Sequence, residues 1–354
     1  MLVVGDVIDD ILVRPLEPVT PGSDTRAQVR RAPGGSGANL AAWLGWLGSV
    51  GPEGPAGSVG SVGLPGSVGP RGSVGSVRPG VTFVGRVGAG DLERHARALR
   101  AYGVRPALAA DPDRPTGTIV LLVGTDGERT MFVERGANPW LGPADLPHDL
   151  LEGTRLLHVS GYALFAEPAR SAVLALAGEA RRRGVPVSID PGSAAFLREV
   201  GAERFLGWTR GALLAFPNAD EAGVLTGLDE PEGAAAALCA SYDVVVLTRG
   251  AEGAVVATRG ADPVRCAADP VAALDSTGAG DAFAAGFLHA WLAGGGGHPG
   301  GVEAGGGEGH PDGAGAGGAE LLGRAVTAAR AGNRVAAQAL GTLGARPPGV
   351  GEEP

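Results

Sequence analysis

Short apolar runs alternate with longer segments rich in Ala and Leu along most of the chain. The runs have the length of buried strands, and the longer segments have the length of helices. The predicted strands cover 1–4, 81–84, 156–159, 185–189, 213–216, 244–248 and 253–257, and residues 264–274 are also strand-like. The predicted helices cover 39–47, 92–102, 168–183, 231–241, 277–293 and 321–339. This alternation predicts an α/β fold with a doubly wound, mostly parallel sheet and helices on both faces.

Two stretches break the alternation and have the pattern of short antiparallel strand pairs. Residues 11–31 hold the first pair, and residues 117–133 hold the second. The turn of the second pair is Gly124-Thr125-Asp126-Gly127, which suits a hairpin. The four strands together predict a small antiparallel β-sheet that is separate from the main one.

Two Gly-rich segments differ sharply from the rest of the sequence. Residues 51–80 consist mainly of Gly, Ser, Val and Pro in near-repeats, and residues 294–318 are largely Gly. Segments of this composition bury no core. We therefore interpret both as low-complexity insertions in surface loops, and the whole chain, 1–354, as a single domain.

The charged residues exclude several classes of protein. The net charge is −9, with 38 acidic and 29 basic residues and no basic stripe, so nucleic acid is not expected as a partner. All 29 basic residues are Arg, because the chain contains no Lys. A Walker-type phosphate loop and Schiff-base chemistry both need a Lys, and both are therefore excluded.

The cysteines and the apolar runs indicate where the protein resides. Cys239 and Cys266 are far apart and lack the spacing of metal ligands, as in proteins of a reducing cytosol. The first residues do not have the pattern of a signal peptide, and no apolar run is long enough to span a membrane. We expect a cytoplasmic protein without a membrane partner.

The run Asp275-Ser276-Thr277-Gly278-Ala279-Gly280-Asp281 carries the strongest chemical signal. It places small residues and a carboxylate at the start of a predicted helix, where unpaired N–H groups and the helix dipole bind phosphate. Gly278 and Gly280 leave room for an anion. Asp281 can accept a proton from an attacking hydroxyl, which completes the equipment for phosphoryl transfer. In the structural alternative, Asp281 only complements the helix dipole, and Ser276 or Thr277 caps the helix.

The same run resembles the D-T-x-G-A-G-D signature of the ribokinase family of carbohydrate kinases, the PfkB type. The resemblance implies a kinase that uses ATP and Mg²⁺ to phosphorylate a small sugar. It also implies that the small sheet is a lid over the sugar and a clasp for a homodimer. The N–H groups of Gly278, Ala279 and Gly280 would stabilise the transferring phosphoryl group, and Asp281 would be the base.

Carboxylates directly after the first predicted strand are candidates for recognition of sugar hydroxyls. Ligands of open α/β sheets bind beyond the C-terminal ends of the strands, and a charged acceptor binds a hydroxyl strongly. The resemblance singles out Asp10 as the sugar-binding residue. It also assigns substrate contacts to Gly35 and Asn39, which lie in a G-G-x-G-A-N motif. Many family members have Lys in place of Ser36.

Two motifs match the nucleotide half of the family's site. Asn218 and Glu221, three residues apart on a starting helix, match an N-x-x-E that organises Mg²⁺ through water. The same pair can equally be a plain helix cap. Thr248, Gly250 and Gly253 match the nucleotide loop T-x-G-x-x-G.

Two assignments concern the C-terminal part of the chain. Asn333 lies on the last predicted helix, where the family frames the adenine of ATP. Asp275, together with Gly344 and Ala345, resembles the monovalent-cation site of ribokinases. Activation by K⁺ is therefore a further hypothesis.

We predict an ATP-dependent carbohydrate kinase that phosphorylates a primary hydroxyl of a small sugar or sugar derivative, with Asp281 as general base. The alternative is a nucleoside kinase of adenosine or pseudouridine type, which shares these motifs. The nucleobase of such a substrate would need an aromatic side chain to stack on, and the candidates are Trp43, Trp46 and Tyr162. The alternative from another class is a sugar-binding sensor that has lost catalysis, although the intact Asp281 argues against it. A Rossmann dehydrogenase is not supported, because no G-x-G-x-x-G follows the first strand.

Overall fold

The computed structural model describes residues 1–50, 80–123, 129–295, 314–342 and 344–348. The predicted 51–80 insertion, apart from Gly80, and the predicted turn at 124–127 lie outside the described residues. The second insertion was predicted to extend to 318, but the last helix, α9 (Ala314–Leu340), begins inside it. Residues 314–318 contain two Ala, which favour a helix, and three Gly, which led to their assignment to the insertion.

The main sheet has nine strands in the order β13-β12-β11-β10-β9-β8-β1-β4-β5. In chain order they are β1 (Leu2–Val4), β4 (Val81–Gly88), β5 (Val104–Asp111), β8 (Leu157–Ser160), β9 (Val187–Asp190), β10 (Leu214–Ala215), β11 (Val244–Thr248), β12 (Ala254–Thr258) and β13 (Val264–Cys266). The strands from β5 to β11 are parallel, and β12 and β13 continue the sheet in antiparallel pairing. The predicted mostly parallel sheet is confirmed.

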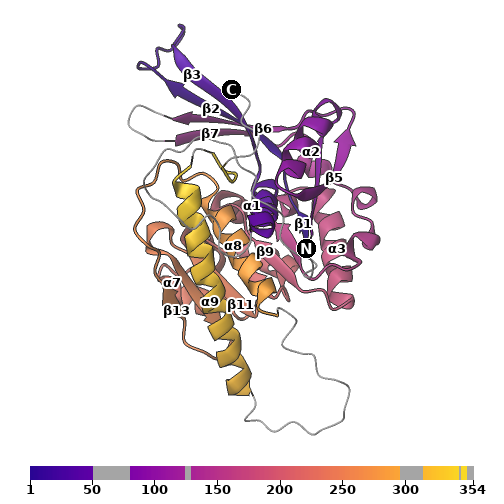
Figure 1. Ribbon diagram of the computed structural model, residues 1–354, viewed down its shortest axis with the longest axis vertical. Helices are drawn as coiled ribbons and strands as arrows, with labels where there is room; N and C mark the ends of the chain where they lie inside the picture. The colour runs from indigo at the N-terminus through magenta and orange to yellow at the C-terminus, as the bar shows by residue number, and fades with distance from the viewer. Residues whose placement is uncertain (51–79, 124–128, 296–313, 343, 349–354) are drawn as a thin grey trace.

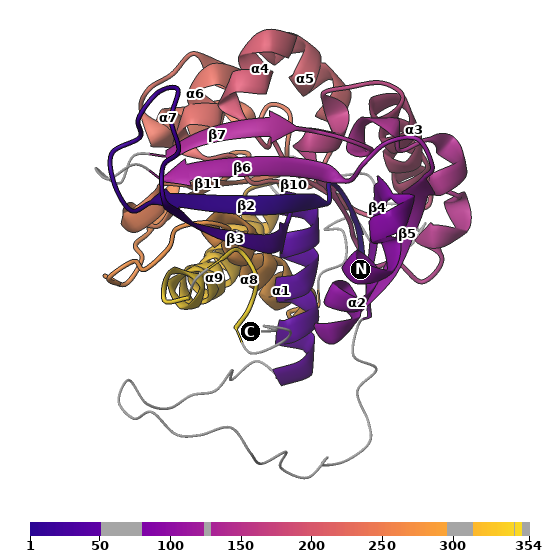
Figure 2. The same cartoon turned by 90° about the horizontal axis from the view of Figure 1, so that it is seen from above.

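Helices cover both faces of this sheet (Figure 2). One face carries α1 (Ser36–Val50), α2 (Leu92–Ala101), α8 (Ala279–Ala293) and α9. The other face carries α3 (Ala169–Arg182), α4 (Ala194–Val200), α5 (Ala202–Thr209), α6 (Ala219–Thr226) and α7 (Pro231–Leu238). The molecule is therefore built of three layers, with the sheet in the middle.

The alternation of side chains along β1 shows why its residues are all apolar. Val3 packs in the core on the α1 and α8 side, whereas Leu2 and Val4 pack in the core on the α3 side. All three side chains have no exposed surface. A central parallel strand buries both of its faces, so each such side chain contributes about 1.5–3 kcal/mol of burial free energy.

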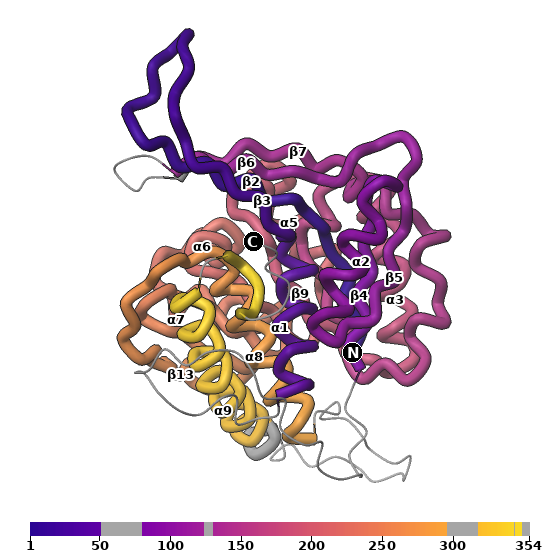
Figure 3. The backbone as a smooth tube through the Cα atoms, turned by 45° about the horizontal axis from the view of Figure 1, so that its top comes forward, coloured from indigo at the N-terminus to yellow at the C-terminus, as the bar shows by residue number. Residues whose placement is uncertain are grey.

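A second sheet of four strands begins shortly after β1 in the chain, and it projects above the main body (Figures 1 and 3). Its strands are β2 (Ile8–Pro15), β3 (Ala27–Gly34), β6 (Gly117–Val123) and β7 (Arg129–Glu134), in the order β3-β2-β6-β7. Both predicted antiparallel pairs are present, and a parallel pairing of β2 with β6 joins them. We call this sheet the lid.

Several elements differ from the sequence-based expectation. The segment before the 275–281 run, predicted to be a strand over 264–274, is a strand only at β13, after which Pro270 and several polar residues interrupt the pattern. The edge strand β5 was not predicted, because Pro106 and three Ala residues hide its strand character. Edge strands tolerate Pro because one side of their backbone is unpaired. Helices α4 and α5 were also missed, because each spans only about two turns, whereas the start of α6 at Asn218 and Glu221 was expected.

Among the described residues, no helix combines the length and apolar character that crossing a bilayer requires.

Candidate active site

The run from Asp275 to Asp281 forms the N-terminus of α8. The helix begins at Ala279, two residues later than predicted, with Gly278 as its N-cap residue. Gly278 has φ +74, and a Cβ atom at this position would lie 2.7 Å from the backbone of Ala345. Only Gly fits such a close approach in a left-handed conformation. The N-cap position of α8 is therefore occupied by Gly278, and not by Ser276 or Thr277.

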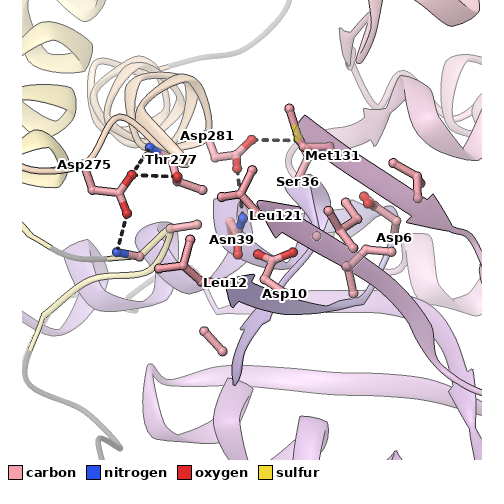
Figure 4. A pocket seen from close by; sticks show the side chains of 18 of the residues that line it. Asp6, Asp10, Leu12, Ser36, Asn39, Leu121, Met131, Asp275, Thr277 and Asp281 are labelled. Carbon is pink, nitrogen blue, oxygen red and sulfur yellow. Dashed lines mark hydrogen bonds between the residues drawn. The ribbon is translucent and has the colours of Figure 1, made fainter. Parts of the chain in front are cut away.

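Asp281, on the first turn of α8, meets the N-terminus of α1. Ser36 donates its hydroxyl to Asp281 Oδ1 at 2.8 Å, and Asn39 donates its Nδ2 amide to Oδ2 at 3.1 Å (Figure 4). Burial raises the pKa of Asp281 to about 7, with the charges of Asp6 and Asp10 acting in the same direction. The two hydrogen bonds oppose this shift, because they favour the ionised carboxylate.

Two cavities meet at Asp281. The first, of about 380 Å³, lies under the lid, and we call it the lid cavity. The second, of about 370 Å³, lies between the N-termini of α6 and α8, and we call it the helix cavity. Ser36, Gly278 and Asp281 line both. A buried carboxylate therefore lies at the boundary between two cavities.

All three residues predicted to bind the acceptor line the lid cavity: Asp10, Gly35 and Asn39. Burial raises the pKa of Asp10 to about 7, an effect strengthened by the Asp6 charge and opposed by Arg346. Gly35 has φ +94, and a Cβ there would lie 2.6 Å from the carbonyl oxygen of Asp6. The G-G-x-G-A-N motif therefore permits the tight turn that brings Asn39 to the cavity.

Arg346, which was not predicted, binds the side chain of Asn39. Its Nε donates to Asn39 Oδ1 and its Nη2 donates to the Gly34 carbonyl, both at 3.3 Å. The Arg346 side chain is buried, and burial lowers its pKa to about 10. Because Arg346 binds the oxygen of the Asn39 amide, it orients the nitrogen towards Asp281.

The helix cavity brings together Asn218, Glu221 and Thr248 with Gly280 and Asp281. Asn218 and Glu221 form a reciprocal cap: Asn218 Oδ1 accepts from Glu221 N, and Glu221 Oε2 accepts from Asn218 N, both at 2.9 Å. The two residues therefore cap helix α6, as the alternative interpretation predicted, and they also line the helix cavity.

Asp190, the last residue of strand β9, also lines the helix cavity and was not predicted. Its place directly after a predicted strand was the available signal. Burial raises the pKa of Asp190, and the carboxylates of Glu221 and Asp281 raise it further. Burial raises the pKa of Glu221 as well.

These carboxylates suit a hydrated cation. Two buried acids that face one space repel each other, and a cation between them would relieve the repulsion. In the described parts of the chain, no cluster of three or more acidic, His or Cys side chains is close enough to enclose a metal ion directly. The residues therefore fit Mg²⁺ that retains water and is shared with phosphates, rather than a closed metal site.

The remaining predicted nucleotide residues lie outside the two cavities. Gly250 and Gly253 form the tight turn after β11, which is closed by a 2.8 Å hydrogen bond from Arg249 N to the Gly253 carbonyl. Asn333 is buried, and its Nδ2 donates to the carbonyls of Cys266 and Ala267 at 3.0 and 3.1 Å. Asn333 thus braces the segment that leads to the 275–281 run, and contact with adenine stays a prediction.

Ala279, the middle residue of the predicted phosphate cradle, lines neither cavity. Its N–H donates to the Ser276 carbonyl at 3.3 Å. The first bond of the helix proper runs from Ala282 N to the Gly278 carbonyl at 2.9 Å. Gly278 and Gly280 are therefore the cradle residues that face the cavities in this structure.

Residues 73–350 match the model of the pfkB family of carbohydrate kinases. The chain belongs to this family. A fructokinase of Klebsiella pneumoniae is 34% identical over 216 residues, which cover 58% of this chain and 69% of the relative. A fructokinase of Escherichia coli is 33% identical over 219 residues, which cover 58% of this chain and 69% of the relative. The protein is therefore an ATP-dependent sugar kinase of the PfkB type.

Solved structures of PfkB-type kinases share the fold. The adenosine kinase of Sinorhizobium meliloti superimposes with a TM-score of 0.73 at 23% identity, over 99% of this chain and 96% of that one. The fructokinase of Vibrio cholerae, solved with fructose, ADP and calcium, has a TM-score of 0.66 at 24% identity, over 97% of this chain and 93% of the fructokinase. The ribokinase-like fold implied by the sequence is thereby confirmed.

Asp275 ties two loops of this PfkB-type kinase together. Its Oδ1 accepts from Thr277 N at 2.9 Å and from Thr277 Oγ1 at 2.7 Å, and its Oδ2 accepts from Gly344 N at 3.0 Å. The carboxylate therefore fixes the C-terminal loop against the start of α8. Binding of a monovalent ion at these loops stays a prediction.

The aromatic candidates for stacking a base have different surroundings. Trp43 is fully buried, and its Nε1 donates to the Ala345 carbonyl at 3.0 Å. Trp46 packs against the same core. Tyr162 lines both cavities. Of the three, only Tyr162 stands at the site.

Proposed function

We propose that this PfkB-type kinase transfers the γ-phosphoryl group of ATP to a primary hydroxyl of a sugar or sugar derivative, with Asp281 as general base. One observation carries the proposal: Asp281 lies where the two cavities meet. The lid cavity contains the predicted acceptor residues, and the helix cavity contains Asn218, Glu221 and Thr248 from the predicted nucleotide and metal motifs.

The acceptor binds under the lid. Asp10 accepts hydrogen bonds from sugar hydroxyls, and Asn39 has one amide hydrogen left for the acceptor after its bond to Asp281. These contacts direct a primary hydroxyl towards Asp281. A site built on such polar groups discriminates against analogues that lack the hydroxyl, because its own buried groups would lose their partners.

The chemical step is a displacement at phosphorus. The hydroxyl oxygen forms a bond to the γ-phosphorus, its proton passes to Asp281, and the bond between the γ-phosphorus and the oxygen bridging to the β-phosphate breaks. The products are the phosphorylated acceptor, ADP and a proton. The N–H groups of Gly278 and Gly280, at the positive end of α8, stabilise the charge on the transferring group. The N–H group of Ala279 can contribute to this stabilisation only if its hydrogen bond to the Ser276 carbonyl breaks.

The nucleotide extends from the helix cavity across Thr248, Gly250 and Gly253 towards Asn333. Asn218, Glu221 and Asp190 are the residues that would hold the water shell of Mg²⁺. When bound, Mg²⁺ neutralises charge on the β- and γ-phosphates. The presence of ADP and calcium in the Vibrio cholerae fructokinase supports this arrangement.

Three further proposals follow from the family. K⁺ binds at the loops that Asp275 joins, and it activates the enzyme by ordering the cradle. The lid forms the contact surface of a homodimer. The enzyme is cytoplasmic, in keeping with its two cysteines, Cys239 and Cys266, which are both buried free thiols.

The experiment that tests the proposed function is ADP release from Mg·ATP with a panel of sugars, sugar acids and nucleosides. Acceptor-dependent ADP release, with phosphate on the primary hydroxyl by NMR, is expected. Release at the same rate with and without every acceptor would contradict it.

A further inference from the structure

The lid cavity has two chemically different halves. Asp10, Asn39 and Asp281 supply polar groups on one side, and Leu12, Leu121 and Met131 face the same space from the lid (Figure 4). The lid also contributes the polar side chains of Arg14, Gln28 and Arg30. The polar groups near Asp10 suit a sugar. The apolar half has no role in the proposed function so far.

The strand register shows how far the apolar half extends. Across β2, β6 and β7, one row of paired residues is Asp10, Ile119 and Val133. The next row along the strands is Leu12, Leu121 and Met131. Neighbouring strands lie about 4.8 Å apart, so Val133 stands about 10 Å from Asp10 across the sheet. A single sugar ring held at Asp10 and Asn39 does not reach the β7 end of these rows.

The wall of the cavity nearest β7 is aromatic. Tyr162 and Phe196 both line it, and their rings meet edge to face with centroids 6.2 Å apart. Phe196 stacks on Phe165 at 5.1 Å, and Phe165 stacks on the fully buried Phe205 at 6.1 Å. Because the stack continues into the core, the position of Phe196 is set before any ligand binds.

Arg135 connects this wall to β7. It lies on the same face as Met131 and Val133, its guanidinium lies 5.8 Å from the centre of the Phe196 ring, and its Nη2 donates to the carbonyl of Tyr162. The cation thus stands at the edge of the aromatic wall, where it has further N–H groups for a ligand.

The apolar lid side chains are exposed. Met131 is 61% exposed and Val133 is 52% exposed, although both face the cavity. Apolar surface turned towards a binding space, opposite rigid aromatic rings, is the composition of a subsite for a flat or apolar group. The binding of such a group would cover this surface.

We propose that the acceptor is a glycoside whose aglycone is a flat, weakly polar ring, such as a nucleoside base, rather than a free monosaccharide. The sugar lies at Asp10 and Asn39, and the ring lies between Met131 and Val133 on one side and Phe196 and Tyr162 on the other. Arg135 donates to polar atoms on the edge of the ring. This inference rests on the proposed function, because it places the reacting hydroxyl at Asp281.

The test compares matched acceptors with the full-length enzyme and Mg·ATP. Ribose is paired with adenosine, inosine and uridine, and glucose is paired with phenyl glucoside. The value of kcat/KM should be at least tenfold higher for the ring-bearing member of at least one pair, since stacking on an aromatic side chain has an effect of this order. A preference confined to the ribose pair identifies a nucleoside, and one confined to the glucose pair identifies an aryl glycoside.

Variants decide whether the aromatic wall is responsible. Phe196→Ala should lower kcat/KM at least tenfold more for the ring-bearing acceptor than for its free sugar. Phe132→Ala is the matched control, because Phe132 lies on the same strand as Met131 and Val133, points to the opposite face and is 58% exposed. It should affect both acceptors equally.

Two results would overturn the inference. One is a free sugar with the higher kcat/KM in every pair. The other is a Phe196→Ala variant that is folded and loses activity equally with both members of a pair. Absence of ADP from every acceptor would contradict the proposed function instead. In that case, calorimetric titration with the nucleosides and with phenyl glucoside decides the subsite: binding that Phe196→Ala abolishes supports it, and no binding of any of them overturns it.

Discussion

Asn138 holds the backbone of Val7 from both sides. Its Oδ1 accepts from Val7 N at 2.8 Å, and its Nδ2 donates to the Val7 carbonyl at 2.9 Å. The same Nδ2 donates to the Arg135 carbonyl at 3.0 Å. Val7 directly precedes β2, the first strand of the lid, and Arg135 directly follows β7, its last strand. One buried amide therefore joins the segment where the chain enters the lid to the segment where it leaves it.

This relationship predicts the effect of replacing Asn138 by Asp. An ionised carboxylate cannot donate, so the carbonyls of Val7 and Arg135 lose their partner, and we expect a loss of about 1–3 kcal/mol in the free energy of unfolding. The lid loses its fixed orientation, so KM for the acceptor should rise while KM for ATP changes little. Steady-state kinetics and thermal denaturation measure both effects. Thr130→Ala, at an exposed position on β7, is the control. A folded Asn138→Asp variant with normal acceptor KM would contradict a positioning role.

The two Gly residues of the cradle should respond differently to a methyl group. A Cβ on Gly278 would lie 2.7 Å from Ala345, at φ +74, whereas a Cβ on Gly280 has no atom within 4 Å. Gly278→Ala should therefore lower both the stability, by about 1 kcal/mol or more, and kcat. Gly280→Ala should keep the stability and lower kcat, because its methyl group enters the space that the phosphoryl group needs. Equal unfolding temperatures of the two variants would contradict this distinction.

The pKa of Asp281, raised to about 7 by burial, predicts how activity depends on pH. A general base acts when it is deprotonated, so kcat/KM for the acceptor should fall about tenfold per unit as the pH drops below this pKa. Ser36 donates a hydrogen bond to the carboxylate and favours its ionisation. Ser36→Ala should therefore move the midpoint of the pH profile of kcat/KM to higher pH. Asp10→Asn removes a negative charge and should move it to lower pH. A midpoint that is the same in the wild type and both variants would mean that another group titrates.

Arg346 is expected to act through Asn39. Arg346→Met removes the bonds to Asn39 Oδ1 and the Gly34 carbonyl, so the amide loses its orientation and kcat/KM for the acceptor should fall at least tenfold. Arg346 also lowers the pKa of Asp10, so the pH profile should shift to higher pH in the variant, which loss of packing alone would not cause. Arg346→Lys should not restore activity, because one ammonium cannot serve two acceptors with the geometry of the guanidinium. Arg97→Met, exposed on α2, is the control. An unshifted profile would leave Arg346 with a purely structural role.

Much of the fold and the centre of the site could be predicted from the sequence, because both depend on local patterns. The strand at 244–248 was predicted with its observed ends, since Val-rich runs of this length have few alternatives. Asp281 and Asn39 were assigned to one site from separate motifs, and the structure joins them by a hydrogen bond.

The residues that were missed act over long distances in the chain. Arg346 reaches Asn39 across 307 positions, and Asn138 reaches Val7 across 131. No local pattern marks an Arg near the C-terminus or an Asn after a strand as a partner for such remote groups. Asp190 stands after an apolar run, and only the arrangement of β9 and α6 brings it to Glu221.

The most direct test of the account is the comparison of Asp281→Asn with the wild-type enzyme. Asn has almost the same shape and keeps an oxygen for one of the two donors, Ser36 and Asn39, so the fold and the binding of acceptor and ATP should change little. It cannot accept the proton, so kcat should fall by about 10²–10⁴. Calorimetric binding together with single-turnover ADP release measures both quantities. Retained binding with kcat reduced by this amount is the predicted result, and a variant that binds and turns over at a near-normal rate would contradict the assignment of Asp281 as the base.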